Sequence, residues 1–232
     1  MHVGPCDTPG GMATVMHTLA EFPPEGWEAE LLASHAPGGL WAKWRAYRRA
    51  RRELKRRCSA PATCPDVVHV HTAADWSWRR KARLIQCLRG RKVSCIVHLH
   101  SGNMVNWLNQ RNLFGVKNYF FMKKFVDRHD VTLVSLSEGW SNRLEPLLGK
   151  SHFISNPVHP RYRQNSDVER ISGKILMVGR NNPVKGHSFA IDVVRRVRET
   201  NSKAHLVMTG INEHPEVWVQ ALGWIPTDEL VN

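Results

Sequence analysis

The chain has 232 residues, of which 42% are hydrophobic and 23% charged, and this composition is typical of a globular protein rather than a disordered or fibrous one. No apolar run approaches the length of about 18 residues that a membrane-spanning helix needs, and the start MHVGPCDTPGG has no secretory signal pattern. The five cysteines form no CxxC pair, which argues against a disulfide framework or a zinc ribbon and favours the reducing cytoplasm.

Short apolar runs alternate with amphipathic stretches along the chain. We predict strands near residue 3 and over 29–34, 66–71, 93–100, 131–137, 151–155, 174–179 and 204–210. We predict helices over 12–21, 41–57, 78–89, 113–127, 138–148 and 187–200. Most of the strands are unbroken apolar runs, as is typical of parallel strands that are buried on both faces. The alternation of strands and helices predicts an α/β protein with two Rossmann-like parallel-sheet domains.

The polar stretch 156–173 contains two prolines and has no apolar period, so we predict that it links the two domains. The N-terminal domain is placed over 1–160 and the second domain over 161–232. The second domain shows only two convincing strands and one long helix, which bury too little surface for a stable core. We therefore expect this second domain to be incomplete.

The net charge of +13 is concentrated in one segment: residues 41–92 hold 16 Lys/Arg and 3 Asp/Glu, and the rest of the chain is balanced. A concentrated basic surface attracts nucleic acid, phospholipid headgroups or phosphorylated substrates. Trp41 and Trp44 lie one helical turn apart among arginines that include Arg48 and Arg52, as in a helix at an anionic membrane surface. The alternative is a solvated basic helix whose aromatic side chains pack on the core.

Gly10 and Gly11 lie between the first predicted strand and the helix that follows it. Glycine permits close approach of a ligand to the backbone, and the free N–H groups of a helix start favour an anion. The segment matches neither GxGxxG nor GxxxxGK[ST], so a turn without a ligand is the alternative.

The motifs HVH and HLHSGN end two neighbouring predicted strands. His71, His100, Ser101 and Asn103 would then lie at the carboxyl edge of a parallel sheet, where α/β proteins bind ligands. Two HxH pairs can hold a metal ion, but no HExxH motif or completing carboxylate accompanies them. We therefore expect hydrogen-bonding histidines near a ligand and no metal.

The segment KILMVGRNNPVKGHSFAIDVV contains a strand that ends at Gly179, a loop with Arg180 and Lys185, and a helix that begins near Gly186. An arginine fork and a lysine ammonium can clamp a diphosphate, and the helix N-terminus adds partial positive charge. A solvated basic loop is the alternative.

The segment VGRNNPVKGHSFAIDVV resembles the signature of family 4 glycosyltransferases, which have the GT-B fold. In that family the Arg and Lys that match Arg180 and Lys185 bind the diphosphate of a sugar nucleotide. His100 matches the active-site histidine, and Ser137 and Asn156 fall in segments similar to cleft-lining turns. The segments PGGMAT, DVVHVH, IVHLHSGN, VSLSEGW, ISNPVHP and LVMTG follow the family order.

The resemblance implies a retaining glycosyltransferase of the hexosyl type that uses a UDP- or GDP-sugar and needs no metal or other cofactor. His100, Arg180 and Lys185 would carry catalysis. The donor phosphates would be approached by a set of loop glycines, namely Gly10, Gly11, Gly179 and Gly186. From this resemblance and the basic segment together, we expect that the acceptor is a lipid-linked glycan or a polysaccharide precursor. We also expect that the protein is cytoplasmic and lies on the inner face of the membrane.

Members of that family carry two glutamates that contact the donor, and the segment that would hold them follows the last residue of this sequence. A sugar-nucleotide-binding protein that transfers nothing is therefore an alternative. A sugar-nucleotide epimerase, which consumes donor without an acceptor, is another. A basic nucleic-acid-binding protein is less favoured, because no RRM, helix-turn-helix or zinc-finger pattern is present.

Overall fold

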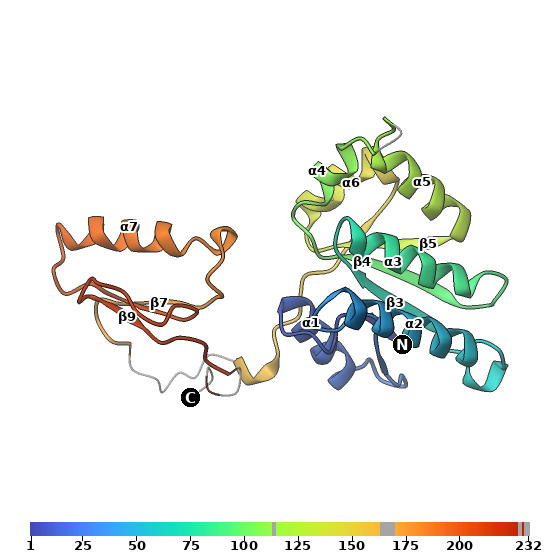
Figure 1. Ribbon diagram of the computed structural model, residues 1–232, viewed down its shortest axis with the longest axis horizontal. Coiled ribbons are helices and arrows are strands. Elements are labelled where there is room, and N and C mark those ends of the chain that lie inside the picture. Colours follow the sequence, from blue (N-terminus) through green and yellow to red (C-terminus); the bar gives the residue numbers. More distant parts are fainter. Residues whose placement is uncertain (113–114, 163–169, 227–228, 230–232) are drawn as a thin grey trace. The chain divides into compact units, whose positions relative to one another are not determined.

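The structure is a computed structural model that describes residues 1–112, 115–162, 170–226 and 229. The chain divides into two compact units, Met1–Val158 and His159–Asn232, which Figure 1 shows with their elements labelled. Each unit is built on a parallel sheet, so the predicted α/β class with Rossmann-like sheets is confirmed. Part of the predicted linker, 163–169, lies outside the described residues.

Unit 1 contains a six-stranded sheet in the order β2-β1-β3-β4-β5-β6, and every neighbouring pair is parallel. Its strands are β1 (His2–Gly4), β2 (Leu31–Ala33), β3 (Val67–Thr72), β4 (Ser94–Leu99), β5 (Val131–Ser135) and β6 (His152–Phe153). The direction of winding reverses between β1 and β3. In open parallel sheets such a reversal leaves a crevice at the carboxyl ends of the strands, where ligands bind.

The helices of unit 1 are α1 (Gly11–Glu21), α2 (Leu40–Arg57), α3 (Trp76–Ile85), α4 (Met104–Asn109), α5 (Asn118–His129) and α6 (Glu138–Leu148). Helices α2 and α3 are neighbours (Figure 1). Trp78 of α3 meets Phe125 of α5 edge to face, with ring centroids 5.4 Å apart. Helix α4 was not predicted. Its buried residues Met104, Trp107 and Leu108 follow helical spacing, but six residues are too few to show a period.

The two faces of the unit 1 sheet have different chemistry. In β3 and β4, residues such as Val70 and Val97 join the apolar core formed with α2 to α6. Since side chains alternate along a strand, the residues between them face the opposite side, and these are largely histidines. Met16 of α1 covers this second side: a Cβ added to Gly4 would lie 2.3 Å from Met16 Sδ and 3.2 Å from the Cβ of His71.

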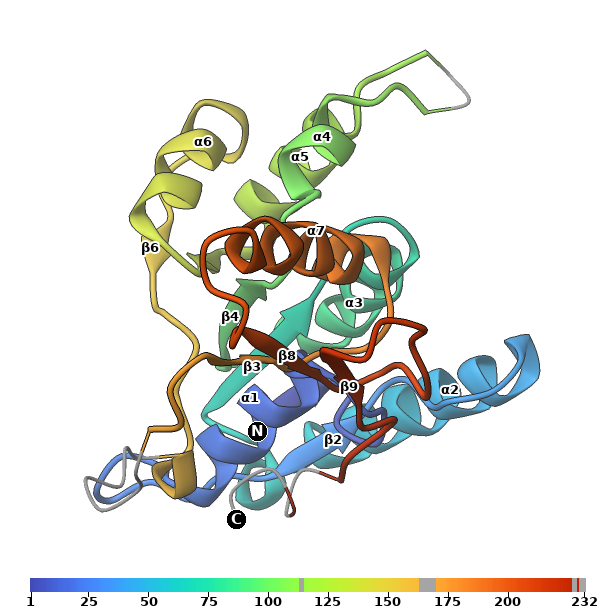
Figure 2. The same cartoon turned by 90° about the vertical axis from the view of Figure 1, so that its left-hand side faces the viewer.

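Unit 2 contains the strands β7 (Lys174–Met177), β8 (His205–Met208) and β9 (Val219–Ala221), paired in parallel in that order. Helix α7 (His187–Arg198) lies over one face of this sheet (Figure 2), and its Val194 packs against Leu206 and Met208. Strand β9 was not predicted, because three residues are too short for a pattern. Short 3-10 helices occur in both units: Pro61–Thr63 and Gln86–Leu88 in unit 1, and Pro160–Tyr162 and Pro183–Lys185 in unit 2.

Candidate functional site

The first group of candidate residues lies at the carboxyl edge of the unit 1 sheet. His71 is near the end of β3, and His100 follows β4, where its backbone N–H donates to the carbonyl of Thr72 at 2.8 Å. The ring atoms His71 Nδ1 and His100 Nε2 are 2.9 Å apart, so one ring donates a hydrogen bond to the other. The structure therefore brings these two predicted site residues into direct contact.

Burial controls the charge of both rings. Burial, and after it the neighbouring His98, lowers the pKa of His100 to about 3. The pKa of His71 is lowered still more, chiefly by burial and then by the surrounding histidines. Both imidazoles are therefore neutral near pH 7, and each offers one donor and one acceptor. His100 can hydrogen-bond a sugar hydroxyl, but it does not carry a positive charge.

The loop after β4 carries the next candidates. Ser101 Oγ accepts a hydrogen bond from the backbone N–H of Asn103 at 3.3 Å, and the exposed Asn103 directly precedes α4 without a side-chain capping bond. The ring of Trp140 lies over this loop, since a Cβ added to Gly102 would be 3.3 Å from it. Sequence reasoning missed Trp140, although it stands in the quoted motif VSLSEGW.

Ser137 and Asn156 have different surroundings. The Ser137 hydroxyl caps α6 by accepting from the backbone N–H of Trp140 at 3.3 Å, so its first role is to fix the start of that helix. Asn156 is exposed in the irregular stretch after β6. Among the described residues, no hydrogen bond joins Asn156 to His71 or His100.

The glycine loop after β1 leads directly into α1. Gly10 has φ of 152° and precedes the helix, and a Cβ added to Gly11 would meet nothing within 4 Å. Helix α1 has no side-chain cap and no acidic residue in its first turn. Its first N–H groups are therefore available to an anion.

The second group of candidate residues lies in unit 2, at the end of β7. The backbone N–H of Gly179 donates to Thr209 Oγ1 at 2.8 Å, and that hydroxyl donates to the Gly179 carbonyl at 3.1 Å. Gly210 has φ of 83°, and a Cβ there would lie 2.3 Å from the Gly179 oxygen. Only glycine fits this close approach. Thr209 and Gly210 were not predicted as site residues, although the motif LVMTG contains both.

Arg180 and Lys185 project from the loop that Gly179 begins. Both are exposed, and neither side chain has an ion pair or hydrogen bond within the part of unit 2 that the structure describes. Asn182 Oδ1 shapes the loop by accepting from the backbone N–H of Val184 at 3.0 Å. Gly186, with φ of 77°, then opens α7, whose first turn has no acidic residue. Two cations without a side-chain partner in the described part of the chain thus lie in the loop that leads into α7.

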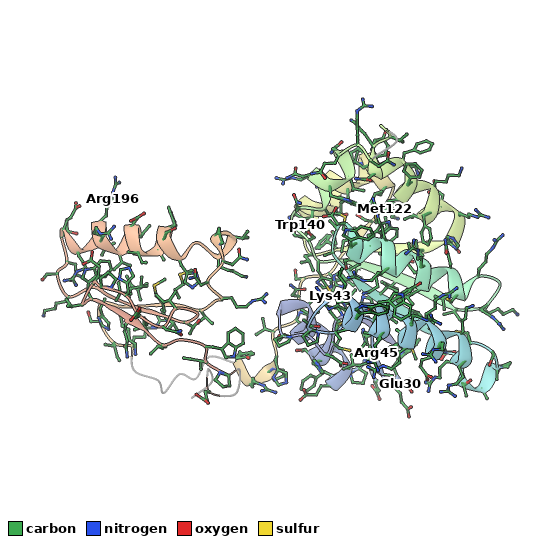
Figure 3. The ribbon with its side chains drawn as sticks, viewed as in Figure 1. Glu30, Lys43, Arg45, Met122, Trp140 and Arg196 are labelled. Carbon is green, nitrogen blue, oxygen red and sulfur yellow. The ribbon has the colours of Figure 1, made fainter. Side chains whose placement is uncertain are left out.

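The basic segment forms an exposed surface along α2, whose Lys43 and Arg45 are labelled in Figure 3. Trp41 is 75% exposed and Trp44 46%, and their rings meet edge to face with centroids 5.3 Å apart. The guanidinium carbon of Arg48 lies 4.8 Å from the centroid of the Trp44 ring. These two tryptophans therefore do not pack into the core. Arg52 lines the same groove as both rings.

No protein-family model matches the chain, and no curated protein matches it. Among solved structures, the chain is similar to the glycosyltransferase SnogD from Streptomyces nogalater, with 12% sequence identity and a TM-score of 0.30. The similarity covers 95% of this chain and 59% of that one. A TM-score this low carries no argument about activity or substrate.

Within the described residues, no helix has both the length and the apolar character needed to cross a membrane.

Proposed function

We propose that the chain is a GT-B glycosyltransferase of the family 4 type, in which unit 2 binds a nucleotide-diphosphate sugar and unit 1 provides the acceptor side. The observation that carries this proposal is the loop from Gly179 to Gly186. Among the described residues, no acidic side chain pairs with Arg180 or Lys185, and both lie in the loop that leads into α7. Two cations and a helix N-terminus form a site that suits a diphosphate.

The chemistry follows from where charge develops during transfer. The bond from C1 of the sugar to a phosphate oxygen breaks, so positive charge grows on the sugar ring and negative charge on the leaving diphosphate. Arg180 and Lys185 stabilise that negative charge. His100, which is neutral and held by His71, hydrogen-bonds the sugar and orients it. We propose retention of configuration, with a UDP- or GDP-sugar as donor and no metal in this step.

The exposed surface of α2 suggests where the acceptor lies. Trp41 and Trp44 stand beside Arg48 and Arg52 on that surface. Each basic side chain near an anionic membrane contributes about 1 kcal/mol to attraction. We therefore propose a lipid-linked glycan or polysaccharide precursor as acceptor, with the protein docked on the inner face of the membrane.

A thermal-shift panel tests the donor site. The chain is titrated with UDP, GDP, ADP and their common sugars, since a ligand that binds only the folded state raises the unfolding midpoint. We expect one nucleotide to raise the midpoint of the wild type. The variant Arg180→Ala/Lys185→Ala should lose that shift, because it lacks both cations of the loop.

The matched control is Arg196→Ala/Lys203→Ala, which removes the same charge from exposed positions of unit 2 outside the loop (Arg196 is labelled in Figure 3). This control should respond to the nucleotide as the wild type does. Equal loss in both double variants would show a non-specific charge effect. Absence of a shift with any nucleotide would contradict the proposed donor site.

A further inference from the structure

The second face of the unit 1 sheet carries a cluster of five imidazole rings, which we name the histidine cluster. It comprises His2 of β1, His69 and His71 of β3, His98 of β4, and His100 just after β4. The register aligns His2 with His69 and His71 with His98, and alternation along the strands turns all of them to one side. Three segments far apart in sequence thus place their histidines together.

The rings contact one another directly. His2 Nδ1 is 3.1 Å from His71 Nε2, and His69 Nε2 is 3.2 Å from His98 Nδ1. The rings of His69 and His71 stack with centroids 4.2 Å apart. Burial lowers the pKa of His2 to about 4 and that of His69 to about 3. These imidazoles are therefore neutral near pH 7, which is the form that binds metal ions.

We propose that His2, His69 and His71 bind one divalent transition-metal ion of the kind that imidazole favours, with Zn²⁺ as the reference ion. One ring nitrogen from each of the three lies within 4.8 Å of the others. A tetrahedral zinc ion with bonds of 2.0–2.1 Å requires ligand nitrogens about 3.4 Å apart. The pair His2 Nδ1 and His71 Nε2, at 3.1 Å, is already close to that separation.

The remaining ring nitrogens support this choice of ligands. A metal-bound histidine usually donates its other N–H to a neighbour, which fixes the tautomer and the ring orientation. With the ion on His71 Nε2, the Nδ1–H of His71 donates to His100 Nε2, 2.9 Å away. Similarly, His69 Nε2–H donates to His98 Nδ1 at 3.2 Å. His98 and His100 then act as the outer partners of the site.

A second triad, His71, His98 and His100, also has nitrogens within 4.8 Å of one another. It is the less favourable arrangement. His98 is 1% exposed, whereas His2 and His69 are only half-buried and give an ion access. Metal binding by the first triad also preserves the contact from His71 to His100. The metal site shares His71 and His100 with the proposed transfer site, but its test measures metal binding and needs no activity.

The experiment measures Zn²⁺ binding to the chain without a polyhistidine tag, by competition with a chromogenic chelator. We expect one high-affinity ion per chain and, with Co²⁺, the visible absorption of a tetrahedral site. His2→Gln should weaken binding about 100-fold or more, because it removes a ligand. His100→Gln should bind nearly as the wild type does, because the amide oxygen can still accept from His71 Nδ1–H.

His152→Gln is the matched control, since this histidine of β6 is exposed and outside the cluster. Circular dichroism confirms that each variant is folded, and His69→Gln replaces His2→Gln if the latter is not. Two results would overturn the assignment. One is wild-type affinity no tighter than that of the ligand variants, and the other is loss of binding in His100→Gln with retention in His2→Gln.

Discussion

Lys81 of α3 is a lysine whose side chain is buried in unit 1. Its side chain is 1% exposed, and within the described residues no acidic group pairs with it. Burial and then Arg80 lower the pKa of Lys81, Cys6 raises it, and the net result is a pKa of about 7. Between pH 7 and 10.5 the unfolded chain therefore holds this proton more strongly than the folded one. It follows that the contribution of Lys81 to stability becomes more favourable as pH rises.

We predict that Lys81→Met increases the free energy of unfolding at pH 7, on the order of a few kcal/mol. The gain should be largest at or below pH 7 and should vanish above pH 10.5, where the lysine is neutral in both states. Denaturant unfolding of both proteins at several pH values measures the difference. Lys92→Met, at an exposed position, should show no such trend. A gain that stays constant with pH would contradict the prediction.

His71 and His100 show which site residues could be located from the sequence. His71 and His100 were predicted at one edge because the carboxyl ends of parallel strands meet there. His2 was not recognised as their neighbour, since the first strand is only three residues long and shows no pattern of its own. Trp140 was missed because its contact with Gly102 joins the first turn of α6 to the loop after β4, which is distant in sequence.

At the scale of elements, the position of the loop from Gly179 to Gly186 depends on its contact with the turn after β8. We predict that Gly210→Ala lowers the free energy of unfolding by about 3 kcal/mol, because φ of 83° is strained for alanine and the new Cβ would lie 2.3 Å from the Gly179 oxygen. The displaced loop should also lose the nucleotide-dependent thermal shift. Denaturant unfolding followed by the thermal-shift panel measures both effects.

Gly11→Ala is a control for which the expected change in the free energy of unfolding has the opposite sign. The position is helical, and a Cβ there would meet nothing within 4 Å. Alanine should therefore raise the free energy of unfolding by about 0.5–1 kcal/mol. If Gly210→Ala were as stable as the wild type, the close approach of the two turns would not be required.

At the scale of the whole molecule, the +13 charge is concentrated in residues 41–92, and α2 presents nine of the Lys/Arg of that segment beside two exposed tryptophans. We predict salt-sensitive flotation with anionic vesicles and little binding to neutral ones, because counter-charges in salt screen an exposed surface. Trp41→Ala/Trp44→Ala should weaken binding several-fold by removing interfacial anchors. A vesicle flotation assay at two salt concentrations measures this.

The control is Phe120→Ala/Phe121→Ala, which removes another exposed aromatic pair, on α5, without changing charge. It should bind vesicles as the wild type does. Equal binding to neutral and anionic vesicles would contradict the electrostatic docking. Steeply salt-dependent binding to DNA or RNA, with no response to vesicles, would favour the nucleic-acid alternative.

The amino-acid sequence by itself determined the α/β class, the position of most strands and helices, and the concentration of charge in one segment. These properties depend on local patterns. Continuous apolar runs such as that of β8 and the amphipathic period of α7 are visible within one stretch of chain. Elements of three or six residues, β9 and α4, are too short for such patterns, and they appear only in the folded chain.

The tertiary structure alone decided which distant residues meet. The strand order β2-β1-β3-β4 places His2 beside His69 and aligns His71 with His98, and it thereby forms the histidine cluster. The packing of α3 against the sheet turns Lys81 inward although its segment is strongly basic. Such contacts depend on the order and register of strands, which are set by long-range packing and not by any single segment.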